Sequence, residues 1–213
     1  MSKKLPIIVL IAVLSILILC GCNDPSGFSI LRGSADEADG IYSVAADDTL
    51  VKIDGEFRSG ALSVKMSAEN FSGDNGIVFG GDFSADDGVY SYYFYCLSGD
   101  GYVKLYAVEG GQKTEVFSAK SHLNLSKEHS LKIVVGGDSV KTFEGYADGR
   151  LSLVYEAAQL KGSGYGFLGN AGVKYSDIDI KEDTIVMETV KSNVHKGSFA
   201  TRGEELTALE DGS

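Results

Sequence analysis

The sequence predicts an all-β fold, an antiparallel sandwich or barrel, from three observations. Short runs of β-branched and aromatic residues recur through residues 41–180, glycine and aspartate separate them, and no convincing amphipathic helical pattern interrupts them. Many short strands at regular spacing, without helices, are typical of antiparallel sandwiches and barrels. The chain has 213 residues, of which 44% are hydrophobic, so it can bury the core of one domain of ordinary size.

Twelve runs have the length and composition of strands, and turn signals separate them. Pairs such as Asp54-Gly55, Asp100-Gly101 and Asp148-Gly149 indicate tight hairpins, because glycine readily adopts the positive φ that such turns need. The predicted strands, in chain order, are IYSV (41–44), TLVKI (49–53), ALSVKM (61–66), GIVFG (76–80), VYSYYFYCL (89–97), YVKLYAV (102–108), TEVFSA (114–119), SLKIVV (130–135), SVKTFEGYA (139–147), LSLVYEA (151–157), YGFLG (165–169) and VKYSDIDI (173–180).

The first 22 residues have the pattern of an export signal. Lys3 and Lys4 precede a nearly unbroken apolar run over residues 5–19. That run is short for a membrane-spanning helix, which needs about 20 residues, and it fits the apolar region of a secretory signal. The junction Leu19-Cys20-Gly21-Cys22 resembles the lipobox of bacterial lipoproteins. The resemblance implies cleavage before Cys22 and attachment of diacylglycerol and palmitate there; the alternatives are a plain secretory signal or an uncleaved anchor.

The chain therefore divides into four predicted parts. Residues 1–21 are the signal peptide, 22–40 a lipidated tether, 41–183 the sandwich, and 184–213 an appendage with a loose end and a weak helical pattern around 203–210. Two or three acyl chains on one cysteine anchor a protein firmly. We therefore expect the protein at the extracytoplasmic face of the cell membrane, held by the lipid on Cys22.

The composition argues against several classes of function. A formal net charge of −11 disfavours nucleic acid, whose phosphates an acidic chain repels. Of the three cysteines, Cys20 leaves with the signal and Cys22 carries lipid, so Cys96 has no partner for a disulfide. Cys96 lies in an apolar strand and is expected to be a buried thiol rather than a nucleophile. Three histidines lie in polar contexts and are expected at the surface: His122, His129 and His195.

Two enzyme-like motifs fail on their context. Gly137-Asp138-Ser139 follows an apolar run, as in GDSL esterases, but a strand pattern follows the serine and no aspartate lies three residues before His195. Residues 164–169, GYGFLG, match the dinucleotide pattern G-x-G-x-x-G, which works only between a strand and a helix. No helix pattern follows, so we interpret the segment as a glycine-rich strand.

Four stretches, taken in order, carry a family resemblance: GALSVKMSAENFSGDNGIVFGGDF (60–83), VYSYYFYCLSGDGYVKLYAVEGGQ (89–112), HSLKIVVGGDSVKTFEGYADGRL (129–151) and GSGYGFLGNAGVKYSDIDI (162–180). They resemble the concanavalin A-like lectin/glucanase sandwich. The closest likeness is to the noncatalytic sandwich at the C-terminus of levanases and to the 3-keto-disaccharide hydrolase type of domain. The resemblance implies a jelly-roll of two curved antiparallel sheets, often binding carbohydrate on the concave face or at the loop rim.

What the protein does is left among three hypotheses. The first is a noncatalytic carbohydrate-binding module. The second is a glycoside hydrolase of the 3-keto-disaccharide type, and the third is a structural envelope module that contacts other proteins. Catalytic relatives of the glucanases carry a Glu-x-Asp-x-x-Glu run that pairs two carboxylates. The sequence has no such run, since Asp177 and Asp179 stand alone on the closing strand, and this favours binding over catalysis.

Alternation along two neighbouring strands predicts a binding face. In 102–108, Val103, Leu105 and Ala107 are expected in the core. In 89–97, Phe94 and Cys96 are assigned to the core. The face opposite would then offer tyrosine rings for stacking on sugars and one lysine, or else pack against another sheet. Its residues are Tyr93, Tyr95, Tyr102, Lys104 and Tyr106.

One acidic loop could hold a structural calcium ion. Asp82, Asp86 and Asp87 place oxygen ligands within a short loop, although an aspartate stands where an EF-hand needs glycine. Asp177 is a second candidate ligand. The alternative is that the loop is simply solvated. No other cofactor is predicted.

Overall fold

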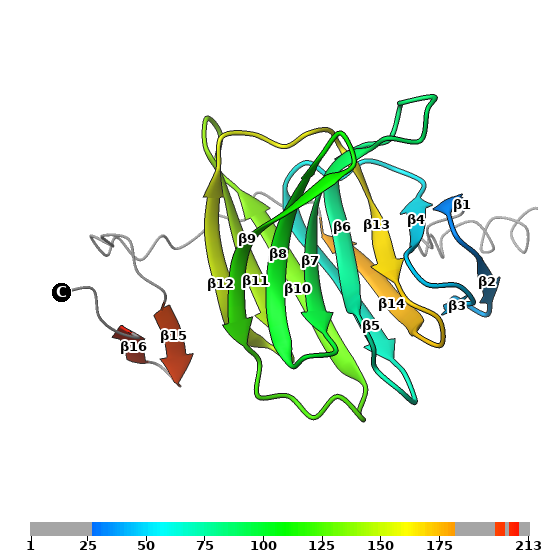
Figure 1. Ribbon diagram of the computed structural model, residues 1–213. Helices are drawn as coiled ribbons and strands as arrows, with labels where there is room; N and C mark the ends of the chain where they lie inside the picture. The colour runs from blue at the N-terminus through cyan, green and yellow to red at the C-terminus, as the bar shows by residue number, and fades with distance from the viewer. Residues whose placement is uncertain (1–26, 182–198, 203–204, 209–213) are drawn as a thin grey trace, which may run out of the picture.

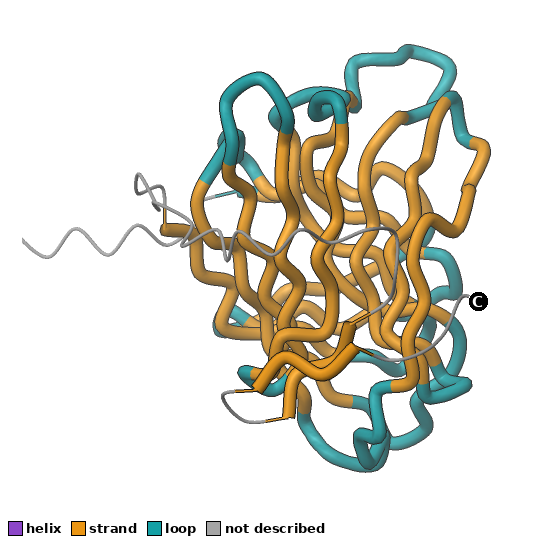
Figure 2. Tube along the Cα trace, turned by 90° about the vertical axis from the view of Figure 1, so that its left-hand side faces the viewer, coloured by secondary structure: helices purple, strands orange, loops and turns teal. Residues whose placement is uncertain are grey.

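The computed structural model describes residues 27–181, 199–202 and 205–208 and contains two seven-stranded antiparallel sheets that face each other (Figures 1 and 2). Sheet A has the order β1 (Phe28–Arg32), β4 (Thr49–Ile53), β13 (Gly164–Gly169), β6 (Asp74–Asp82), β7 (Ser91–Ser98), β8 (Tyr102–Glu109), β9 (Gln112–Lys120). Sheet B has the order β12 (Arg150–Ala157), β11 (Lys141–Ala147), β10 (His129–Gly136), β5 (Gly60–Ser67), β14 (Lys174–Lys181), β3 (Ile41–Val44), β2 (Ala35–Ala38). The described residues contain no helix, and the predicted two-sheet jelly-roll sandwich is confirmed.

Each of the twelve predicted runs coincides with a strand, with ends shifted by no more than a few residues. The chain moves repeatedly between the sheets, so strands distant in sequence become neighbours, as when β13 pairs with β4 and β6. β13 is the glycine-rich segment with the dinucleotide-like pattern. A Cβ on Gly166 would lie 1.9 Å from the carbonyl oxygen of Val51, so close strand packing accounts for the glycine there.

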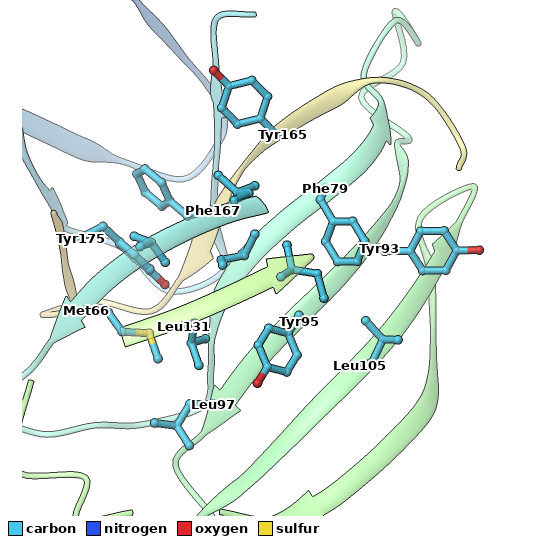
Figure 3. Close-up of a cluster of buried hydrophobic side chains, with 14 of the residues drawn as sticks. Met66, Phe79, Tyr93, Tyr95, Leu97, Leu105, Leu131, Tyr165, Phe167 and Tyr175 are labelled. Carbon is cyan, nitrogen blue, oxygen red and sulfur yellow. The ribbon is translucent and has the colours of Figure 1, made fainter. Parts of the chain in front are cut away.

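The main core lies between the sheets and is rich in aromatic rings (Figure 3). Phe79 and Phe143 meet edge to face with centroids 5.0 Å apart, and Phe167 stacks on Tyr175 at 4.3 Å. Polar atoms of the buried tyrosines are satisfied. Tyr175 donates a hydrogen bond to the Leu168 carbonyl at 2.7 Å, and the Tyr95 hydroxyl lies 2.7 Å from that of Ser152.

Tyr93 and Tyr95 belong to this core, so their predicted place on the opposite face is wrong. The reason is the length of the β7–β8 turn. Residues 99–101 form a three-residue turn with Gly101 at φ 85°, which pairs Leu97 with Val103 and Tyr95 with Leu105. Since Val103 and Leu105 face the core as predicted, their partners must face it too. A turn of two or four residues would have shifted the pairing by one residue and placed Tyr93 and Tyr95 on the opposite face of the sheet.

Phe94 and Cys96 accordingly lie on the outer face of sheet A, where Phe94 is opposite Tyr106 and Cys96 is opposite Lys104. This face carries a second apolar cluster, which includes Tyr92 and Val108. Cys96 is nonetheless fully buried, as predicted, and burial raises the pKa of its thiol. Sheet A is therefore apolar on both faces, and its outer face needs a covering of loops and long side chains.

Two described segments, one near each end of the chain, differ from expectation. Residues 28–32 and 35–38, assigned to a tether, form β1 and β2, which are edge strands of sheets A and B. Within 203–210, where a weak helical pattern was noted, β16 (Glu205–Ala208) pairs with β15 (Phe199–Arg202) as a two-stranded sheet. Cys22 and His195 fall outside the described residues. Within the part that is described, no helix is long and apolar enough to span a membrane.

His129 is buried, although the sequence predicted it at the surface, whereas His122 is exposed as expected. The Nδ1 atom of His129 lies 2.9 Å from Oδ2 of Asp148, and its Nε2 atom lies 2.9 Å from the carbonyl oxygen of Asn124. Asp148 also accepts a hydrogen bond from the Ser130 backbone at 2.9 Å. The ring thus ties the loop before β10 to the β11–β12 turn.

Candidate functional site

A pocket of about 180 Å³ lies on the outer face of sheet A; we call it the aromatic pocket. Its lining combines rings, aliphatic side chains, two glycines and three charged groups. The lining residues are Arg32, Asp48, Gly88, Tyr90, Tyr92, Phe94, Val108, Gly111, Lys113 and Leu168.

The aromatic pocket lies on the concave side of sheet A. Arg32 is in β1 and Lys113 is in β9, the two edge strands of the seven-stranded sheet. Strands lie about 4.8 Å apart, so these edges are on the order of 29 Å apart along the sheet. Side chains from both edges line one small hollow, so the sheet must curve around it. This agrees with the curved sheets that the family resemblance implies.

Two aromatic side chains of β7 form the floor of the pocket. Tyr92 and Phe94 project to the same side because side chains two residues apart share a face. Phe94 stacks on Tyr106 of β8, with centroids 6.0 Å apart and planes 19° apart. Phe83, from the loop after β6, lies 5.6 Å from the Tyr90 ring and 6.0 Å from the Tyr92 ring, centroid to centroid. The loop thus extends the aromatic surface beyond the sheet.

One wall is an ion pair between Arg32 and Asp48. The Nη2 atom of Arg32 donates to Oδ1 of Asp48 at 2.9 Å, and its Nε atom donates to the Asp48 carbonyl at 3.0 Å. Asp48 has φ 54°, a conformation that aspartate tolerates better than most residues. Burial raises the pKa of the neighbouring Tyr92 hydroxyl, and the Arg32 charge opposes that rise. This wall therefore offers fixed donors and acceptors beside a ring.

The opposite wall is Lys113, which is held by Asp74. Its Nζ atom lies 2.6 Å from Oδ2 of Asp74 and 3.8 Å from the centroid of the Tyr106 ring. Burial of the Asp74 carboxyl disfavours its charged form. Hydrogen bonds from Lys113 and Ser98 outweigh that effect, and the Asp74 pKa lies below its ordinary value. Burial is the main cause that raises the pKa of Tyr106, and its hydrogen bond to the Asp74 carboxyl raises it further. The lysine ammonium is therefore fixed over the rings as a charged, hydrogen-bonding wall.

Three of the five residues predicted to bind ligand share the face of the pocket. Tyr102 and Lys104 lie on it next to Tyr106, and Lys104 Nζ is 2.6 Å from Oδ2 of Asp100. None of the three lines the pocket itself, and the other two, Tyr93 and Tyr95, lie in the inter-sheet core. Sequence reasoning missed the lining residues of β7. The odd number of turn residues, 99–101, is the signal that could have placed them.

Two carboxylates of the acidic loop accept hydrogen bonds from neighbouring residues. Asp82 accepts hydrogen bonds from the backbone and hydroxyl of Ser84, at 3.0 and 2.6 Å, and Asp87 accepts one from the Val89 backbone at 3.0 Å. Asp177 pairs with Lys65 at 2.7 Å. Among the residues that the structure describes, no three His, Cys, Asp or Glu side chains gather closely enough to hold a metal ion, Asp86 included.

A larger, open hollow of about 950 Å³ lies beside the start of β1, the β2–β3 hairpin and the bulge of β14. Its carboxylates include Glu37, Asp39 and Asp177. Glu37 accepts a hydrogen bond from the Gly40 backbone at 2.8 Å, and Asp177 is paired with Lys65. This hollow offers few ring faces, since Tyr42 is almost fully buried. The aromatic pocket is therefore the stronger candidate site.

Solved structures share this architecture. The carbohydrate-binding module CBM66 from Bacillus subtilis superposes with a TM-score of 0.54 at 18% identity, over 71% of this chain and 93% of that chain. This likeness shows the fold, a sandwich of two antiparallel sheets. A β-glucanase from Bacillus licheniformis matches with a TM-score of 0.47 at 10% identity, over 71% of this chain and 79% of that one. The galectin LEC-6 from Caenorhabditis elegans gives a TM-score of 0.46 at 12% identity, over 68% of this chain and 99% of that one. No family model and no curated protein matches the chain.

Proposed function

We propose that the protein is an extracytoplasmic lipoprotein whose sandwich binds carbohydrate in the aromatic pocket without catalysis. The observation that carries the proposal is the make-up of that pocket, a ring floor between two walls of ion-paired side chains. Sugars suit such a site because their C–H faces stack on aromatic rings while their hydroxyls meet fixed donors and acceptors.

Binding is favoured over hydrolysis by the charges at the pocket. Hydrolysis by the usual mechanism needs two carboxyl groups facing the scissile bond. Of the described residues that line the pocket, Asp48 is the one carboxylate, and Arg32 already holds it. The module therefore has the groups to hold a sugar but not the pair that would cleave a glycosidic bond there.

Glycan binding is tested with the Arg32→Gln variant on a broad glycan array, followed by calorimetry on the best ligand. Losing a wall donor that touches the ligand should weaken binding at least tenfold, since charged hydrogen bonds contribute about 1.5–3 kcal/mol. Arg58→Gln is the matched control, because Arg58 also pairs with a neighbouring carboxylate, Glu56, at 3.0 Å but does not line the pocket. Wild-type protein that binds nothing on the array, or equal binding by both variants, would contradict the proposal.

Membrane attachment rests on the sequence Leu19-Cys20-Gly21-Cys22 after a basic head and an apolar run. The test is expression of the full chain in a bacterium fed an alkyne-labelled fatty acid. We expect label on the wild-type chain and none on Cys22→Ala. Label that persists in Cys22→Ala would show that the anchor is not on this cysteine.

A further inference from the structure

The two walls of the aromatic pocket are each neutralised within the protein. Arg32 is paired with Asp48 at 2.9 Å, and Lys113 is paired with Asp74 at 2.6 Å. The pocket lining therefore carries two cations and one carboxylate, Asp48, while the second carboxylate, Asp74, pairs with Lys113 from outside the lining. The chain as a whole has a formal net charge of −11. A ligand carboxylate would compete with Asp48 or Asp74 for its cation, and the released aspartate would lose its partner.

The paired side chains are better suited to hydroxyl groups than to a charge. An ion pair presents N–H donors and carboxylate acceptors side by side, and a sugar hydroxyl can both donate and accept. The Arg32 guanidinium has five N–H groups, and the hydrogen bonds to Asp48 use two of its nitrogen atoms, Nε and Nη2. Hydroxyls can thus bind at this wall without breaking the ion pair.

The size of the pocket limits what it can hold. Its volume of about 180 Å³ is below the range of about 300–1,000 Å³ that is usual for drug-sized ligands. It is roughly the space of six water molecules, at about 30 Å³ each. That space suits one sugar ring rather than several.

We propose that the aromatic pocket selects a single uncharged sugar ring and rejects the same ring when it carries a carboxylate. This inference rests on the proposed carbohydrate binding and adds the ligand class. Asp48 is the residue that sets the selectivity at the Arg32 wall, because it occupies the cation that a uronic acid would otherwise use.

The test measures binding of three matched pairs at pH 7 by NMR titration: methyl glycosides of glucose, galactose and mannose against the corresponding uronic acids. We expect wild type to bind at least one neutral ring tenfold or more tightly than its acid. Asp48→Asn leaves Arg32 unpaired, so this variant should bind the acid at least threefold more tightly than wild type does. Added salt should reduce the discrimination, because the charges involved are partly exposed.

Asp177→Asn is the matched control for Asp48→Asn. Both aspartates have positive φ, 54° for Asp48 and 49° for Asp177, and their side chains are equally exposed at 64%. The control should keep the wild-type selectivity, and thermal melting should show both variants folded. Should Asp48→Asn fail to fold, Asp74→Asn provides a second variant. It frees the Lys113 ammonium and should bind the acid at least threefold more tightly than wild type does; unchanged binding of the acid would overturn the inference.

The outcomes separate the two proposals. Wild type that binds a uronic acid as tightly as its neutral partner overturns the charge selectivity while leaving carbohydrate binding intact. Wild type that binds none of the six sugars but binds a larger glycan on the array also overturns this inference alone. Wild type that binds no glycan in either experiment overturns the proposed function itself.

Discussion

The Nζ atom of Lys113 lies 3.8 Å from the centroid of the Tyr106 ring. The two residues are diagonal neighbours across the β8–β9 ladder, where Val108 is directly opposite Lys113. Asp74, which starts β6, holds the lysine in this position. Three strands of sheet A thus fix one wall of the pocket, so its geometry is as stable as the sheet.

Replacing Asp74 should make the stability of the protein less dependent on pH. Folding lowers the pKa of Asp74, so this carboxylate stabilises the protein above the ordinary carboxyl range, and the contribution is lost as pH falls through the folded-state pKa. At pH 7, Asp74→Asn should be less stable than wild type by about 1–2 kcal/mol. Thermal melting between pH 7 and pH 2.5 should show this gap closing below about pH 5.

Asp86→Asn is the control for this series, because Asp86 lies in an exposed loop. Its melting temperature should follow wild type at each pH. A gap between Asp74→Asn and wild type that stays constant down to the lowest pH would show that Asp74 acts through packing rather than through its charge.

Tyr95 should matter for stability and not for ligand binding. Its hydroxyl lies 2.7 Å from that of Ser152 inside the core, and a Cβ on Gly145 would lie 2.8 Å from its ring. Tyr95→Phe should reduce the free energy of unfolding by about 1 kcal/mol, which lowers the melting temperature by roughly 2–4 °C. Affinity for any array ligand should stay within twofold. A large loss of affinity at unchanged stability would contradict this and support the predicted role of Tyr95 in ligand binding.

Gly166→Ala should be far more damaging than Gly172→Ala. At Gly166 a Cβ would meet the Val51 carbonyl oxygen at 1.9 Å, and backbone in the middle of a sheet cannot move aside. At Gly172 a Cβ meets nothing within 4 Å, and the cost is the positive φ of 87°, about 1–2 kcal/mol. Urea unfolding of the two variants should differ by several kcal/mol, or Gly166→Ala should not fold. Similar values would mean that β13 is not packed as described.

His129→Asn should destabilise the protein by about 2–4 kcal/mol, because it empties a buried site and leaves Asp148 and the Asn124 carbonyl without their partner. His122→Asn is the control, since His122 is exposed with φ 57°, which asparagine also tolerates. Its effect should stay within about 0.5 kcal/mol. Chemical denaturation measures both, and equal effects would argue against a structural role for the His129 ring.

Most of the fold could be predicted because its strands are strongly patterned. β3 and β4 have the predicted ends, since each is a short β-branched run between turn residues. β2 was missed because its sequence, ADEA, has little β propensity. It is a strand because β3 offers it an edge to pair with. His129 was misplaced for a similar reason, because its partner Asp148 lies in a distant turn and no local pattern shows their contact.

The predicted binding residues of β8 lie on the face that carries the aromatic pocket, whereas those of β7 lie in the inter-sheet core. Tyr92 and Phe94 alternate with Tyr93 and Tyr95, so both faces of this strand are aromatic and alternation cannot choose between them. Arg32 and Asp48 come from segments that only the curvature of sheet A brings to the pocket. Such residues have no sequence signal near β7.

The most direct test of carbohydrate binding in the aromatic pocket is mapping of backbone amide shifts during titration with the best array ligand. We expect saturable shifts to cluster at Gly88, Tyr92, Gly111 and Lys113, which line the pocket. Shifts that cluster instead at Asp39, Gly40 and Ile41, around the larger hollow, would contradict this location.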